Sequence, residues 1–289
     1  MARIVAGLGA TGLSATLVDA WKPPSGVWFQ FGSVLLGFVV VIVAVLPVPG
    51  VRTRPGAYLM ASLGDPLRNF FARYRQQAGW ILALICLYRL SDFVLTVMNP
   101  FYLDLGFTLP EVAEVRKIFG VVATMAGIFT GGWAVARLGL MRALLLGALG
   151  GPLSNLVFFW LATRGHDVPS LFVAISLDNA FGGFSATCLI AYMSSLTTAG
   201  FTATQYALFS SLYAIPGRLV ASQSGRIVEA AARAAESGGA LSGLRGLFSA
   251  LPPESFAGAM SKSGVSPASL GSGYAAFFLY SCAIGVFAI

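Results

Sequence analysis

The feature that most constrains this chain is a series of apolar runs, each about as long as a membrane-spanning helix. A helix needs about 20 mostly apolar residues to cross the hydrocarbon core of a bilayer. Several runs in the sequence reach or approach that length, and few charged residues interrupt them. Because lipid cannot satisfy exposed backbone groups, such runs are expected to form α-helices packed into a bundle.

Composition supports this expectation. Of the 289 residues, 57% are hydrophobic and only 10% are charged, whereas soluble domains carry about 25% charged residues. The net charge is +7, but the basic residues lie mostly between the apolar runs. We therefore interpret them as signals of membrane orientation and expect no nucleic acid as a partner. The predicted fold class is an all-α, polytopic membrane helical bundle.

The apolar runs divide the chain into three parts. Residues 1–47 hold two expected spans. Residues 48–78 form a polar linker whose apolar residues recur at helical spacing, which predicts an amphipathic helix on the membrane surface. Residues 79–289 hold the remaining spans, expected at residues 80–98, 109–136, 140–163, 169–196, 204–228 and 274–289. Because apolar runs reach both ends, we expect the chain to be a fragment or to need helices from a partner.

Local signals refine these boundaries. Asn99 and Pro100 are expected to end the span over 80–98, and Thr108 with Glu111 resembles a capping box at the start of the next span. Residues 231–271 are rich in Gly, Ser and Ala, which predicts a flexible loop.

Orientation follows from the basic residues of the short connections. The connection over residues 52–78 carries five Arg, so it is predicted to be cytoplasmic. The loop over residues 231–271 then falls on the opposite side of the membrane.

The sequence gives no sign of enzymatic chemistry. Cys86, Cys188 and Cys282 lie in separate apolar runs without metal-ligand spacing, and we interpret them as buried small side chains. The single His166 is interpreted as a surface residue rather than a proton relay. No P-loop or Gly-x-Ser-x-Gly motif is present. We expect no enzyme, no cofactor, no metal and no ATP-driven pump, and a secondary transporter is the simplest interpretation.

Two pairs of polar residues interrupt the apolar spans. Arg89 and Asp92 are three residues apart, so a helix places them on one face. Charges inside a membrane are costly, so this pair must face protein or a water-filled cavity. Asp178 and Asn179 form the second pair, where desolvation favours the protonated carboxyl group. For both pairs, the alternative to a functional role is a structural one in helix packing.

Further candidates lie in the later spans. Asn155 suits either helix packing through hydrogen bonds or contact with a substrate. Gln205 begins the span expected over residues 204–228. Pro216, Gly217 and Arg218 interrupt the same span and indicate a kink or gating point.

Four segments of the sequence resemble the AmpG-type muropeptide permeases. The likeness runs from about Asp65 to Glu229. The segments are Leu-Tyr-Arg-Leu-Ser-Asp (87–92), Gly-Phe-Thr-Leu-Pro-Glu-Val-Ala-Glu-Val (106–115), Asp-Asn-Ala-Phe-Gly-Gly (178–183) and Phe-Thr-Ala-Thr-Gln-Tyr-Ala-Leu-Phe-Ser-Ser-Leu (201–212).

The resemblance implies a fold and a function. These permeases have the major-facilitator fold, with two halves of six helices, and this chain would hold mainly the C-terminal half. The implied function is import of anhydromuropeptides across the inner membrane by proton symport. Such import serves cell-wall recycling and, in species with an inducible β-lactamase, its induction. The implied partners are a muropeptide or other small molecule, protons, membrane lipid and the missing N-terminal helices.

The resemblance also assigns roles to particular positions. Arg89 and Asp92 match the basic and acidic pair of a family motif. Asp178 and Asn179 match its Glu-Asn pair with Asp in place of Glu, and Gln205 matches the Gln of its Ala-Thr-Gln motif. The predicted residues are Arg89, Asn155, Asn179 and Gln205 for substrate binding, Asp178 and Asp92 for proton coupling, and Pro216, Gly217 and Arg218 for gating.

Two alternatives remain open from the sequence. One is a transporter of another substrate on the same fold, such as acetyl-CoA or an organic anion. The other is a truncated membrane subunit that does not itself transport, which the missing helices would favour.

Overall fold

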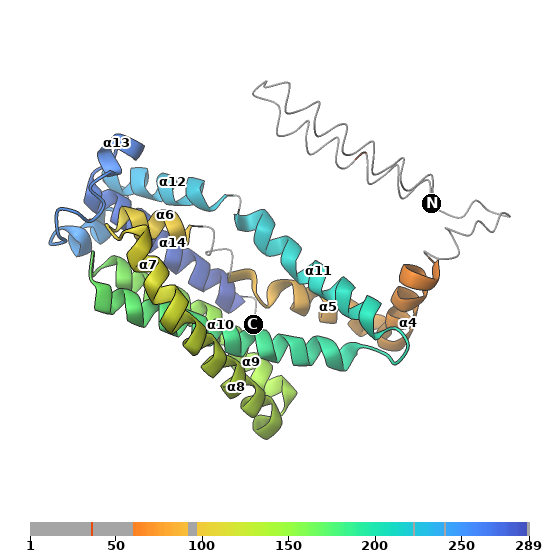
Figure 1. The fold of residues 1–289 in the computed structure, drawn as a ribbon. Coiled ribbons are helices and arrows are strands. Elements are labelled where there is room, and N and C mark those ends of the chain that lie inside the picture. The colour runs from red at the N-terminus through yellow and green to blue at the C-terminus, as the bar shows by residue number, and fades with distance from the viewer. Residues whose placement is uncertain (1–35, 37–59, 92–96, 222, 240, 288–289) are drawn as a thin grey trace. The chain divides into compact units, whose positions relative to one another are not determined.

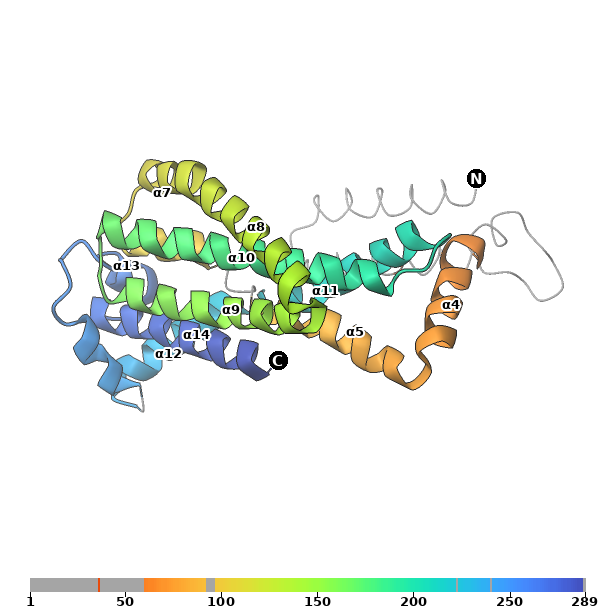
Figure 2. The same ribbon diagram turned by 90° about the horizontal axis from the view of Figure 1, so that it is seen from below.

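The computed structural model describes residue 36 and residues 60–91, 97–221, 223–239 and 241–287 (Figures 1 and 2). Every regular element among these residues is a helix, so the predicted all-α class is confirmed. The chain splits into two compact units after Arg75, and each is described by itself. Apart from Leu36, the two spans expected within residues 1–47 lie outside the described residues.

The first unit contains the helix expected in the linker. A π-helical turn, η1 (Met60–Gly64), leads into α4 (Asp65–Tyr74). Phe70 is buried on one face, whereas Leu67 and Phe71 are exposed. A helix is therefore present in the linker, and its amphipathic placement on the membrane surface stays a prediction.

The second unit contains four helices that are long and apolar enough to cross a membrane, counted among the described residues. The first runs without a break through α7, a π-helical turn and α8. By length and composition, these helices indicate a multi-pass membrane protein. Their bounds are α7 (Leu109–Val115), η4 (Arg116–Gly120), α8 (Val121–Leu138), α9 (Leu140–Ala162), α10 (Val168–Leu196) and α14 (Pro267–Phe287).

The start of α7 has the capping box expected from the sequence. The Glu111 backbone N–H donates to Thr108 Oγ1 at 3.4 Å, and the Thr108 N–H donates to Glu111 Oε2 at 2.7 Å. These two bonds satisfy backbone donors that the helix itself leaves unpaired. The prediction is confirmed.

The span expected over residues 80–98 differs from the structure. Helix α5 (Ala78–Leu87) ends early, and α6 (Met98–Asp104) begins where the span was expected to stop. Pro100 therefore starts a helix rather than ending one. A proline is tolerated in the first turn because the backbone N–H that it lacks would have no helical partner there.

The span expected over residues 204–228 also differs. Helix α11 (Thr202–Ala221) runs through Gly217 and ends at Ala221, and α12 (Ser224–Glu236) follows it. The expected span is therefore divided after Ala221, beyond the Pro-Gly-Arg triplet.

The predicted flexible loop over residues 231–271 is largely folded, which corrects the expectation. It contains the end of α12, the 3-10 helix η5 (Ser242–Phe248), α13 (Ala259–Ser263) and the start of α14. Phe248 and Phe256 are only 4% and 0% exposed. A few widely spaced aromatic side chains anchor this segment. The average composition, which is dominated by Gly, Ser and Ala, gives no sign of them.

The anchors insert into an aromatic core that joins α6, α9 and α14. The Phe101 ring lies 5.0 Å from that of Phe278, and the Phe158 ring lies 5.8 Å from the same residue. The Phe256 ring stacks on Tyr274 at 5.9 Å. Such ring pairs stabilise a core beyond their buried area.

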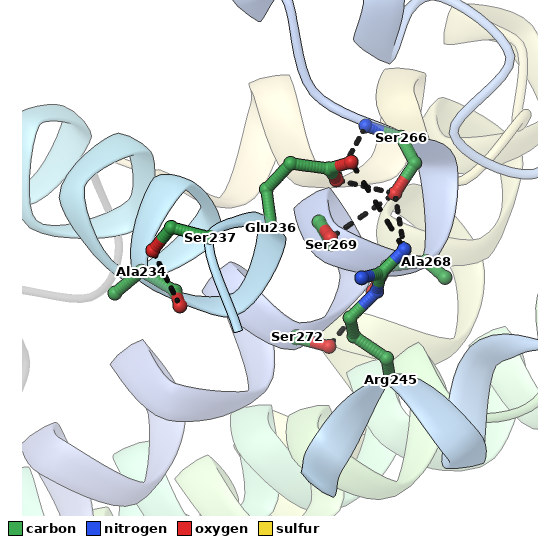
Figure 3. A network of polar contacts seen from close by, with 8 residues as sticks. All are labelled: Ala234, Glu236, Ser237, Arg245, Ser266, Ala268, Ser269 and Ser272. Carbon is green, nitrogen blue, oxygen red and sulfur yellow. Dashed lines mark hydrogen bonds and ion pairs between the residues drawn. The ribbon is translucent and has the colours of Figure 1, made fainter. Parts of the chain in front are cut away.

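A polar network fastens the end of α12 to η5 and the start of α14 (Figure 3). Glu236 Oε2 accepts hydrogen bonds from the backbone N–H and the hydroxyl of Ser266, at 3.0 and 2.6 Å. Arg245 lies 4.0 Å from Glu236 Oε1 and donates to Ser266 Oγ at 3.4 Å. These serine hydrogen bonds lower the pKa of Glu236 to about 2.

Candidate functional site

A cavity of about 400 Å³ in the second unit gathers several of the polar residues predicted from the sequence. Arg89, which follows α5, lines it together with Asp178 and Asn179 from α10. Hydroxyl residues complete the polar lining, namely Thr124 from α8, Ser154 from α9, and Ser185 and Thr187 from α10. Residues from two separate sequence motifs therefore share one site.

Close contact between α8 and α10 shapes one wall of this cavity. A Cβ atom added to Gly127 would lie 2.1 Å from the Ala180 carbonyl oxygen, and one added to Gly183 would lie 2.5 Å from the Thr124 carbonyl oxygen. The two backbones thus approach as closely as only glycine allows. This approach brings Thr124 against Asn179.

The amide of Asn179 is fixed by two neighbours. Its Nδ2 donates to the Ile175 carbonyl oxygen at 2.8 Å, and its Oδ1 lies 3.2 Å from Thr124 Oγ1. An amide group has two N–H donors and two acceptor lone pairs. These bonds set the orientation of the amide and leave further hydrogen-bonding capacity for a polar ligand.

The cavity combines a cation with a carboxyl group. Arg89 and Asp178 are both half-buried at this site. A guanidinium group binds carboxylates through two parallel hydrogen bonds, and a carboxyl group inside a membrane is suited to reversible protonation. The structure therefore places Arg89, just after α5, and Asp178, in α10, at one cavity although they lie far apart in the sequence. Asp92 lies outside the described residues.

Two predicted residues lie elsewhere. Asn155 is 3% exposed, does not line the cavity, and has no hydrogen-bond partner for Nδ2 among the described residues. Gln205 is 1% exposed, and its Oε1 accepts a hydrogen bond from the Thr198 backbone N–H at 2.8 Å, which closes the turn between α10 and α11. Substrate binding by either residue stays a prediction.

The gating residues are only partly described. Gly217 lies in α11 and does not line the cavity. The structure does not describe the side chains of Pro216 and Arg218, so a gating role for them stays a prediction. Within the described residues, no group of three or more His, Cys, Asp or Glu side chains has a metal-binding arrangement.

Sequence reasoning did not assign the hydroxyl groups of Thr124, Ser154, Ser185 and Thr187 to a binding site. A single hydroxyl residue in an apolar helix gives no signal of its own. A signal was present for Thr124, since Gly120, Thr124, Gly127 and Gly131 follow the spacing of one helix face. Small residues at that spacing indicate close helix packing in a membrane.

Comparison with known proteins agrees with the motifs. No family model matches the chain. The anhydromuropeptide permease of Escherichia coli K12 is 32% identical over 76% of this chain and 44% of its own length. The resemblance to the AmpG-type permeases is confirmed. Putative transporter AmpG 4 of Rickettsia conorii is 33% identical over 57% of the chain and 39% of its own length. Putative transporter AmpG 1 of Rickettsia bellii is 35% identical over 51% of the chain.

The chain spans less than half the length of these AmpG-type relatives. These matches therefore cover only part of each permease.

Proposed function

We propose that this chain is part of a secondary transporter that imports anhydromuropeptides across the inner membrane. The observation that carries the proposal is the cavity where Arg89, Asp178 and Asn179 meet, in a chain similar to a protein named anhydromuropeptide permease. In this proposal the cavity is one wall of a larger binding site, which the other helices of the transporter complete. Import would serve cell-wall recycling and, where a β-lactamase is inducible, its induction.

The chemistry of the cavity supports this substrate. A muropeptide carries carboxylates, hydroxyls and acetamido groups. The guanidinium group of Arg89 can bind a carboxylate through two hydrogen bonds, and the amide of Asn179 can pair with an acetamido or hydroxyl group. The volume of about 400 Å³ falls within the range of about 300–1,000 Å³ for small-molecule sites.

Within the proposal, Asp178 carries the coupling proton. It lines the same cavity as Arg89, so its charge state acts directly on a bound anion. When Asp178 is ionised it competes with a substrate carboxylate for Arg89, and protonation removes that competition. Binding of a proton to Asp178 therefore strengthens binding of an anionic substrate, and binding of the substrate strengthens binding of the proton.

The test of substrate binding is uptake in cells that carry a substitution at the native locus, so that the natural gene product is made. Arg89→Gln should abolish uptake of labelled anhydromuropeptide without lowering the amount of protein. Arg89→Lys should retain part of it, because an ammonium group lacks the planar fork. Arg137→Gln, an exposed residue in the last turn of α8, is the matched control. Unchanged uptake with Arg89→Gln would reduce Arg89 to a structural role, and competition by acetyl-CoA or organic anions would favour another substrate.

Proton coupling has a separate test. Asp178→Asn mimics the protonated state, so this variant should lose gradient-driven accumulation and keep substrate exchange across the membrane. If accumulation persists in Asp178→Asn and disappears in Asp92→Asn, the coupling role belongs to Asp92.

A further inference from the structure

A second cavity, of about 300 Å³, lies between α6, α12 and α14 and shares no lining residue with the first. Its polar lining includes Asp104, Ser224, Glu229, Lys262 and Tyr274. Helices α6, α12, α13 and α14 gather at one end of the second unit in Figure 1, and α12, α13 and α14 lie together at that end in Figure 2 as well. The cavity thus lies among elements that the proposed function does not use.

Ser224 is the strongest sign that this cavity takes a ligand. The residue is 1% exposed, it lines the cavity, and its hydroxyl has no hydrogen-bond partner in the part of the chain that the structure describes. A buried hydroxyl without a partner costs free energy. A polar group bound in the cavity would remove that cost.

The start of α12 adds further donors at the same place. Ser224 and Gly225 are the first residues of this 13-residue helix, and both line the cavity. The first backbone N–H groups of a helix have no acceptor within it, and no side chain caps this one. Such a helix start favours a negatively charged group.

Lys262 supplies a positive charge to the cavity. Its Nζ donates to Asp104 Oδ1 at 2.6 Å, and the Tyr274 hydroxyl donates to Asp104 Oδ2 at 2.8 Å. Asp104 is thereby occupied in holding Lys262 and Tyr274. An ammonium group has three N–H donors, so Lys262 retains donors for a ligand.

Glu229 places a negative charge in the same lining, one and a half turns along α12 from Ser224. It pairs with Arg233 at 3.1 Å, and its side chain is 53% exposed. The lining therefore offers donors for a carboxylate and, separately, an acceptor for an ammonium group.

We propose that this second cavity binds a small zwitterion, an amino acid or the end of a short peptide. Ser224, the start of α12 and Lys262 bind its carboxylate, and Glu229 faces its ammonium group. The proposal is independent of muropeptide transport, because it concerns a different cavity.

The test is binding of glycine and glycylglycine to the full chain in detergent, measured by saturation-transfer nuclear magnetic resonance. Acetate and ethylamine serve as probes that carry only one of the two charges. Both zwitterions should bind, and the tighter of the two identifies the ligand as an amino acid or a peptide end. Acetate and ethylamine should each bind at least about tenfold more weakly, because each forgoes one charged hydrogen bond.

Substitutions then locate the site. Ser224→Ala should weaken zwitterion binding about tenfold. Lys262→Met should weaken it more, and Lys262→Arg should restore part of it. Ser237→Ala is the matched control, because its exposed hydroxyl at the other end of α12 bonds only to the Ala234 carbonyl oxygen within the described residues.

Three results would overturn the proposal. The first is that neither zwitterion binds, and the second is that acetate binds as tightly as glycine. The third is that binding survives both Ser224→Ala and Lys262→Met but is lost with Arg89→Gln, which would move the ligand to the first cavity.

Discussion

The contact between α8 and α10 and the segment from Glu236 to Ser266 are held in opposite ways. In the first, glycines let two backbones meet, as at Gly127 and Ala180. In the second, partly exposed side chains such as Arg245 form hydrogen bonds and ion pairs, and a few buried aromatic rings anchor the chain. The backbone contact between α8 and α10 leaves no space for an added side-chain atom. The segment from Glu236 to Ser266 is instead stabilised by the sum of several small interactions.

This difference bears on where each region can support a site. A wall made of backbone contacts keeps Thr124 and Asn179 at a fixed separation, which suits recognition of a specific solute. Exposed ion pairs contribute only about 0–1 kcal/mol each. We therefore expect substitutions in the α8–α10 contact to have the larger effects.

The largest effect should come from Gly127→Ala. Its Cβ would lie 2.1 Å from a backbone oxygen, so the helices must separate. Overpacking of this kind lowers the stability of the folded protein by about 1–3 kcal/mol and occasionally more. Uptake should be lost because less folded protein is present. Thermal unfolding in detergent measures the first effect. Gly132→Ala, where the added Cβ meets nothing within 4 Å, should behave like the wild type; equal stability of the two variants would break the comparison.

An intermediate effect is expected from Thr124→Val. The change keeps the shape but removes the contact at 3.2 Å that orients Asn179. Loss of one hydrogen bond costs about 1 kcal/mol, so uptake should fall several-fold while the protein stays folded. Thr124→Ser should restore it. Thr130→Val is the control, because Thr130 Oγ1 contacts only carbonyls of its own helix among the described residues.

The smallest effect is expected from Glu236→Gln. The pKa of Glu236 is lowered from 4.5 to about 2 by its serine hydrogen bonds, so the unfolded state binds more protons between these values. The stabilisation is therefore complete above pH 4.5 and is lost as the pH falls through about 2. Melting temperatures measured across pH should differ between wild type and variant by a constant amount above pH 5 and converge below it.

Glu254→Gln is the control for that series, since the Glu254 side chain has no hydrogen bond among the described residues. A difference between wild type and Glu236→Gln that grows as the pH falls would contradict the assignment of the network.

The same contrast explains what the sequence could predict. The capping box at Thr108 depends on residues three apart, and the spans of α9 and α10 depend on continuous hydropathy, so both are local signals. The charged and amide groups of the first cavity were found because polar residues stand out in apolar runs.

What the sequence could not predict depends on contacts between distant segments. Phe256 anchors its segment through the Tyr274 ring and through a hydrogen bond from its N–H to the Asp104 carbonyl oxygen, which lies far away in the chain. The sequence did not predict the start of α14, because Ser269 and Ser272 lower the mean hydropathy there even though both residues are buried. The Ser272 hydroxyl is satisfied within the helix, since it donates to the Ala268 carbonyl oxygen (Figure 3). Local averages carry no information about such partners.

The most direct test of the first cavity as the substrate site is protection of an introduced cysteine. Gly182 lines the cavity, and a Cβ added there meets nothing within 4 Å. Gly182→Cys would be made at the native locus with the three natural cysteines, Cys86, Cys188 and Cys282, replaced by alanine. Gly132→Cys, which lies outside the cavity, is the control.

Membranes from these strains would be treated with a permeant maleimide, with and without anhydromuropeptide. We expect the substrate to slow labelling of Gly182→Cys and to leave labelling of Gly132→Cys unchanged. Labelling of Gly182→Cys at the same rate with and without saturating substrate would contradict this expectation.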